Sequence, residues 1–172
     1  MTRIFGAALW VSVLIPLATL AEQPDLRTPA PVIHLTDNLD EPDGLGWCID
    51  TQGRGFGPYL HAHSCKPRGG DVQFELDPGT ALIRSVAFPD FCMVYEPNAA
   101  SPMGLEACDP AASDQAFGYA SATGQITLGR DPSLCLSVGA ESRPAGPFSS
   151  RSLGMEPCDG VPPARKSWTV LP

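Results

Sequence analysis

The sequence has 172 residues and a formal net charge of −8, and its few basic residues form no patch. An acidic surface repels a phosphate backbone, so nucleic acid is not an expected partner. The 19 prolines, 17 glycines and six cysteines separate short apolar runs, without a long stretch of helical period. This pattern favours a disulfide-bonded, all-β protein.

Residues 1–21 have the pattern of a secretory signal peptide. Arg3 precedes an uncharged apolar run, and small residues up to Ala21 match the positions where a signal peptidase cleaves. The run is short for a membrane span and is interrupted by Pro16, so an uncleaved transmembrane helix is the weaker interpretation. We therefore expect a secreted or periplasmic protein.

The rest of the chain is predicted to hold a short tail and one domain. Residues 22–31 contain three prolines and are expected to form an extended linker or tail. Apolar strand-like runs begin at Val32, and residues 32–172 have a length typical of a single domain.

The domain is built from a repeat. The first cysteine of each unit recurs at spacings of 44 and 43 residues, and an aromatic residue follows the second cysteine by nine or ten residues. Such a period indicates a repeat architecture, in which one unit of about four strands cannot bury its apolar face alone. Three units are therefore expected to close a small barrel around a pseudo-threefold axis. The expected units are about residues 44–87, 88–130 and 131–172, with core aromatics Phe74, Phe117 and Trp168.

The same symmetry selects one disulfide pairing among the 15 that six cysteines allow. Each unit should pair its own two cysteines, since an exported chain folds where disulfides persist. Each bridge would constrain the unfolded chain by roughly 3 kcal/mol. The expected pairs are Cys48–Cys65, Cys92–Cys108 and Cys135–Cys158.

The pattern resembles the ricin B-type lectins over about residues 44–172. The first cysteine of a unit is followed by an apolar residue and Asp50, and Gln115-Ala116-Phe117 matches the family's Gln-x-Trp motif with Phe for Trp. The third copy keeps Trp168 without the Gln, and the first copy has its Gln one place late, at Gln73. The resemblance implies a β-trefoil that binds carbohydrate, a galactose-type sugar, without catalysis. It would contact membranes only through surface glycans.

The resemblance also implies a sugar site in the first unit. Asp50 occupies the position of the family's hydroxyl acceptor, and His63 the position of its stacking aromatic. Asp71 stands where the family has Asn, so a donor is lost that Gln73 is expected to replace. A turn-capping role for Asp50 and a surface position for His63 are the simpler alternatives.

The other two units lack this set of residues. The second has Val94 and Glu106 at the acceptor and stacking positions, and the third has Ser137 and Glu156. A carboxylate offers no ring face for a sugar. We therefore expect at most one intact sugar site, in the first unit.

A narrower resemblance suggests a second function. The segments 74–92 and 168–172 are similar to the ricin-like A and C subunits of cytolethal distending toxins. This implies a protein-interaction trefoil with decayed sugar sites, acting as a cell-binding and delivery subunit with an exported partner protein.

Other chemistry receives less support. His61 and His63 alternate on one strand and could begin a zinc site with Asp50 or Asp71, although two surface polar residues are the simpler interpretation. The acidic run 37–43 does not have EF-hand spacing and is expected to be a solvated turn, with weak calcium binding as the alternative. We expect no catalytic residue, no metal and no cofactor.

Overall fold

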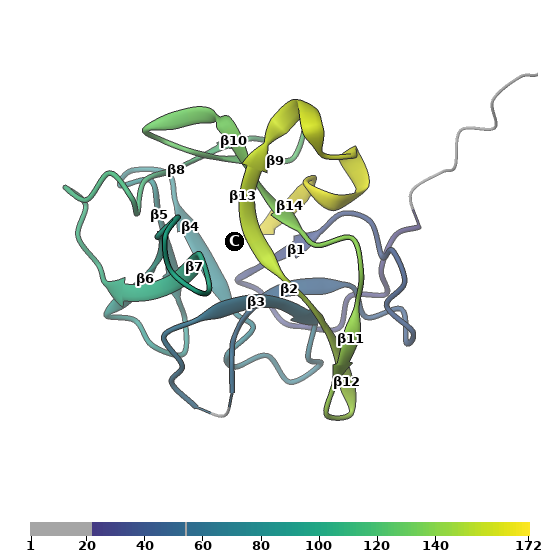
Figure 1. Cartoon of the computed structure of the whole chain (residues 1–172). Helices are drawn as coiled ribbons and strands as arrows, with labels where there is room; N and C mark the ends of the chain where they lie inside the picture. The colour runs from purple at the N-terminus through teal and green to yellow at the C-terminus, as the bar shows by residue number, and fades with distance from the viewer. Residues whose placement is uncertain (1–21, 54) are drawn as a thin grey trace, which may run out of the picture.

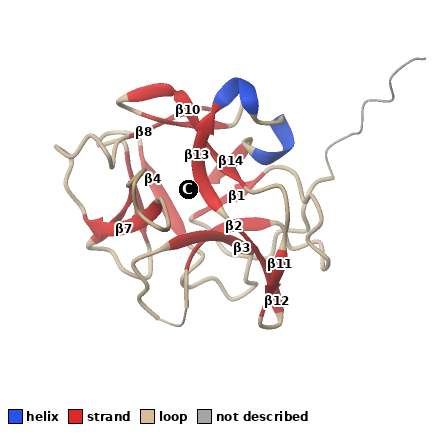
Figure 2. Ribbon diagram, in the orientation of Figure 1, coloured by secondary structure: helices blue, strands red, loops and turns tan. Residues whose placement is uncertain are grey.

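The computed structural model describes residues 22–53 and 55–172, so the expected signal peptide lies outside the described residues. The described chain is built from short strands and two single-turn 3₁₀ helices (Figures 1 and 2). The strands are β1 (Val32–Leu35), β2 (Trp47–Thr51), β3 (Leu60–Ser64), β4 (Phe74–Asp77), β5 (Leu82–Ser85), β6 (Phe91–Tyr95), β7 (Met103–Ala107), β8 (Phe117–Ala120), β9 (Gln125–Leu128), β10 (Asp131–Val138), β11 (Arg143–Ala145), β12 (Phe148–Arg151), β13 (Leu153–Pro157) and β14 (Trp168–Leu171). The 3₁₀ helices are η1 (Cys158–Gly160) and η2 (Pro163–Arg165).

The strands form an all-β trefoil of three sheets, as the repeat predicted. The sheet orders are β11-β12-β3-β2-β1-β14, β13-β10-β9-β8 and β4-β5-β6-β7. The hairpins β2–β3, β6–β7 and β10–β13 are equivalent, because the first cysteine of each unit faces the residue two places before the second cysteine. The three facing pairs are Cys48 with His63, Cys92 with Glu106, and Cys135 with Glu156.

The barrel closes through the two ends of the domain. β4 pairs with β5 at the end of the first unit, and β8 pairs with β9 at the end of the second. The third unit has no such strand after it, and β14 pairs instead with β1, with Leu35 opposite Trp168. The strand that completes the third unit thus comes from the start of the domain.

The expected disulfide pairing is confirmed. Each unit holds one bridge, and the three Cα–Cα distances are 5.0, 4.9 and 5.0 Å. The repeated aromatics Phe74, Phe117 and Trp168 are buried in one core that all three units share. The indole of Trp168 donates a hydrogen bond to the Leu136 carbonyl at 2.9 Å, so its polar atom is satisfied inside the core.

The tail before β1 lies along the first unit. Asp25 N donates to the Gly44 carbonyl at 2.7 Å, and Thr28 Oγ1 donates to the Lys66 carbonyl at 2.9 Å. Leu26 packs against a small cluster that contains the Cys48–Cys65 bridge. The tail therefore holds in place the loop that follows Cys65.

The acidic run 37–43 is only partly a solvated turn. Glu41 is 4% exposed, and its carboxylate accepts hydrogen bonds from Leu45 N and Ser64 Oγ, both at 2.7 Å. Asn38 is also 4% exposed and accepts a hydrogen bond from Gly46 N at 3.0 Å. The expectation of a solvated turn was wrong for these two side chains, because they satisfy backbone and hydroxyl donors that the loop buries.

One hairpin crosses between units. β11 and β12 form an insertion between β10 and β13 of the third unit, yet β12 pairs with β3 of the first unit (Figure 1). Arg151 anchors it: its guanidinium lies 4.9 Å from the Trp47 ring and donates to the Gly139 carbonyl at 2.6 Å and to Asp40. This hairpin accounts for the longer cysteine loop of the third unit and brings Phe148 to the first.

Candidate functional site

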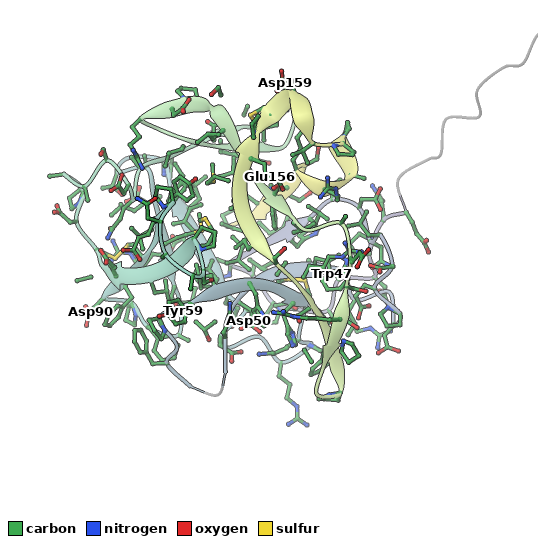
Figure 3. The ribbon with its side chains drawn as sticks, in the orientation of Figure 1. Trp47, Asp50, Tyr59, Asp90, Glu156 and Asp159 are labelled. Carbon is green, nitrogen blue, oxygen red and sulfur yellow. A yellow bond between two sulfur atoms is a disulfide. The ribbon has the colours of Figure 1, made fainter. Side chains whose placement is uncertain are left out.

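A cleft of about 390 Å³ lies between the first unit and the β11–β12 hairpin. Asp50 on β2, which Figure 3 labels, lines it together with His61 and His63 on β3 and with Lys66 in the following loop. The opposite wall is the hairpin turn, residues 145–148. The cleft therefore combines side chains from two units.

The pairing of β2 with β3 brings the polar side chains together. Asp50 faces His61 across the hairpin, and His63 lies two residues further on the same side of β3. The two imidazole rings have centroids 5.2 Å apart. Asp50 lies inside a strand, so it is not the turn-capping carboxylate considered as an alternative.

The carboxylate of Asp50 is buried and only partly bonded. The residue is 1% exposed, and its Oδ2 lies 2.8 Å from Lys66 Nζ, 3.7 Å from His61 Nε2 and 3.6 Å from His63 Nδ1. Burial alone would raise the pKa of Asp50, but hydrogen bonding from His61 and Lys66 and the Lys66 charge outweigh it and lower the pKa. Oδ1 has no hydrogen-bond partner among the described residues.

Lys66 joins the two predicted acidic residues. Its Nζ lies 2.8 Å from both Asp50 Oδ2 and Asp71 Oδ1. Burial would lower the pKa of Lys66, but hydrogen bonds to the two carboxylates outweigh burial and raise it. An ammonium group has three N–H donors, so one remains for a ligand. The sequence prediction missed Lys66; the available signal was a basic residue directly after Cys65, where the other units have Asp109 and Asp159.

His63 does not offer a free ring face. It is 6% exposed, its Nδ1 lies 3.0 Å from the Ser64 carbonyl, and its ring packs at 67° to the Phe148 ring with centroids 5.5 Å apart. Burial lowers the pKa of His63 and keeps the ring neutral near pH 7. The half-buried aromatic ring that lines the cleft is Phe148, which the sequence prediction also missed. The feature of the sequence that could have indicated Phe148 is the longer loop between the two cysteines of the third unit.

Gln73 lies apart from the other predicted site residues. Its Nε2 donates to the Pro29 carbonyl at 3.0 Å, and its Oε1 accepts from Gly70 N at 2.8 Å. Both ends of the amide thus hold the tail and a loop turn, and Gln73 does not line the cleft. The structure brings together Asp50, His63 and Asp71, with Lys66 in the donor position that Gln73 was expected to fill.

The equivalent positions of the other units are arranged differently. Val94 is buried, and Glu106 opposite Cys92 is exposed. In the third unit, Ser137 Oγ donates to Glu156 Oε1 at 2.5 Å, so the hydroxyl at the acceptor position is already bonded within the protein.

Within residues 22–53 and 55–172, no group of three or more His, Cys, Asp or Glu side chains is placed to hold a metal ion. The helices of that same part are too short and too polar to cross a membrane.

Comparison with known proteins defines the class of fold. No protein-family model and no curated protein sequence matches the chain. Solved structures do match. The agglutinin from Abrus precatorius is 16% identical with a TM-score of 0.56, over 84% of this chain and 48% of the agglutinin chain. An earthworm lectin C-terminal domain mutant, solved with 6′-sialyllactose, is 15% identical with a TM-score of 0.53, over 81% of this chain and 95% of that domain.

A third match is GalNAc-T7, solved with UDP, GalNAc and Mn²⁺, at 18% identity and a TM-score of 0.51, over 73% of this chain and 20% of the enzyme. The chain thus spans about half the length of the agglutinin chain and a fifth of the enzyme. The fold is a lectin-like β-trefoil. More narrowly, it is structurally similar to the ricin B-type lectin domains, as the sequence resemblance predicted.

Proposed function

We propose that this protein is a secreted, non-enzymatic carbohydrate-binding module whose single sugar site is the cleft of the first unit. The observation that carries this proposal is the buried Asp50 carboxylate, which lines the cleft with one oxygen unpartnered. A sugar site needs a hydroxyl acceptor, a donor and an apolar ring surface. Asp50, the third N–H of Lys66 and the Phe148 ring supply these three elements.

A small movement of the Lys66 side chain would let the sugar reach the Asp50 carboxylate. Asp50 Oδ1 is enclosed, and Lys66, with 23% of its side chain exposed, is more exposed than His61 or His63. A shift of Lys66 toward Asp71 would expose the Asp50 carboxylate to a ligand hydroxyl and keep one ion pair. A buried acceptor without a donor costs about 1–3 kcal/mol, which a ligand hydroxyl would recover.

The compartment and the absence of catalysis belong to the same proposal. Three disulfides indicate an oxidising compartment, which supports export to the periplasm or the cell exterior. Asp50, which lines the cleft, and Asp71, which does not, are both ion-paired with Lys66, so neither is poised to act as a general acid. A galactose-type sugar is proposed from the likeness to lectins.

A single shallow site implies weak binding. We expect a Kd of about 0.1–10 mM for one sugar, equivalent to roughly −4 to −5 kcal/mol. Useful retention on a glycan-coated surface would therefore need several copies of the protein or several copies of the glycan.

The test is a glycan array with the wild type, Asp50→Asn and the matched control Ser137→Ala. Asp50→Asn preserves side-chain volume and replaces one carboxylate oxygen with an amide donor, whereas Asp50→Ala would also leave a void. We expect binding by the wild type and the control, and loss of binding by Asp50→Asn at a temperature where circular dichroism shows all three folded. A wild type that binds no glycan on a multivalent array would refute the proposal.

A second candidate, a protein-binding delivery subunit like those of cytolethal distending toxins, is favoured by one observation. Phe56 is 47% exposed, and its ring lies 4.5 Å from the Phe91 ring and 5.2 Å from the Phe88 ring. Phe88 and Phe91 are partly buried, and an exposed ring that packs on such neighbours is typical of an interaction surface.

This candidate predicts a stable complex with one exported protein. The complex should be seen by size-exclusion chromatography with light scattering, be lost in Phe56→Ser and survive in Asp50→Asn. A chain that elutes alone from its native secretome would contradict this candidate and leave the sugar-binding proposal standing.

A further inference from the structure

A second cleft lies next to the candidate sugar site. It has a volume of about 370 Å³ and is lined by residues 66–69 and by Phe148. Lys66 and Phe148 line both clefts. The two hollows are therefore neighbours that share one cation and one aromatic ring, and each has a volume at the lower end of the range for small-molecule sites.

Phe148 is held between them by contacts with two units. It is the first residue of β12, directly after the Gly146-Pro147 turn, and its ring packs against the ring of His63. Gly146 has a φ of +65°, a conformation that a side chain disfavours and that sets the tight turn. A ligand that fills the first cleft and extends beyond one sugar ring into the second would contact Phe148 in both clefts.

The two clefts differ in charge. The first has Asp50 among its lining residues, whereas the second is lined by Lys66 and Arg68 and by no acidic side chain. Arg68 is exposed and forms no ion pair within the described part of the chain. On a protein of net charge −8, a hollow whose charged lining residues are Lys66 and Arg68 suits an anionic group, which a free guanidinium can bind through two parallel N–H bonds.

We infer that the ligand is an acidic oligosaccharide that crosses Phe148, with a neutral sugar unit at Asp50 and a carboxylate- or sulfate-bearing unit at Arg68. This inference rests on the proposed sugar-binding function and assigns its substrate class. The neutral unit contacts the Asp50 carboxylate and the Phe148 ring, and the acidic unit contacts the unpaired guanidinium of Arg68. The third N–H of Lys66 lies at the junction and can donate to the link between the two units.

The test uses an array of matched glycan pairs, each neutral oligosaccharide printed beside its sialylated, uronate-bearing or sulfated counterpart. The wild type should prefer the acidic member by about tenfold, and added salt should reduce the preference. Arg68→Gln should abolish the preference and leave neutral binding unchanged. The control Arg130→Gln, at an exposed arginine of the second unit paired with Asp114, should behave as the wild type.

Titration calorimetry with the best-bound pair then tests the shared ring. Phe148→Ala should weaken both members of the pair by tenfold or more, and Phe148→Leu, which keeps the packing volume, should weaken them less. Equal binding of neutral and acidic members by the wild type, or an unchanged preference in Arg68→Gln, would overturn this inference alone. Failure to bind any glycan would instead overturn the proposed function.

Discussion

The buried contact between Asp50 and Lys66 should be worth a measurable part of the stability. Asp50→Asn removes the charge from a carboxylate that is 1% exposed and 2.8 Å from the ammonium group. A hydrogen bond to a charged group contributes about 1.5–3 kcal/mol. Lys66 is 23% exposed and keeps Asp71, so we place the loss at the lower end, about 1.5 kcal/mol.

Urea unfolding at pH 7 measures this loss directly. With an m value of about 2 kcal/mol/M, Asp50→Asn should lower the urea midpoint by roughly 0.8 M without changing m. A double-mutant cycle with Lys66→Met isolates the pair, and we expect a coupling of about 1 kcal/mol. If Asp50→Asn has the same effect with and without Lys66→Met, the carboxylate is not stabilised by Lys66 and the geometry described for the cleft is refuted.

Two further predictions concern the folded state. Burial lowers the pKa of His34 and of His63 below 6.5, so the unfolded chain takes up protons first as the pH falls. The free energy of unfolding should therefore decrease from about pH 6.5 downward, and a urea midpoint that stays constant between pH 7.5 and 5 would contradict this. Arg151→Ala should destabilise by about 2–3 kcal/mol through its lost hydrogen bonds and cation–π contact. The exposed control Arg143→Ala should change the thermal midpoint little, and similar effects of both variants would show that Arg151 does not anchor the hairpin.

The repeat made the framework of the fold predictable. Each unit carries its own two cysteines and its own core aromatic. Short sequence patterns that recur along the chain therefore predict the disulfides and the burial of Phe74, Phe117 and Trp168. The role of β1 could not be predicted in this way, because Val32–Leu35 lies before the first cysteine and outside the three expected units. Only closure of the barrel shows that β14 needs it.

The candidate site was predictable only where the repeat is regular. Asp50 and His63, which line the cleft, were predicted because they hold positions defined relative to cysteines. Phe148 was not found, since it lies in an insertion that breaks the repeat and then packs on a different unit. Lys66 was not found because its importance depends on two carboxylates that the fold brings to the same ammonium group.

The pairing of β1 with β14 has a consequence for how the protein reaches its native state. The opening strand is made early and pairs on one edge with β2, but its other edge has no partner until Trp168–Leu171 becomes available, far along the chain. During synthesis this edge is open to other extended segments, a state that favours aggregation. Joining these two strands with a short loop and opening the chain between β4 and β5 would bring β1 and β14 together early, but it would make β4 and β5, which pair with each other, the distant ends of the new chain.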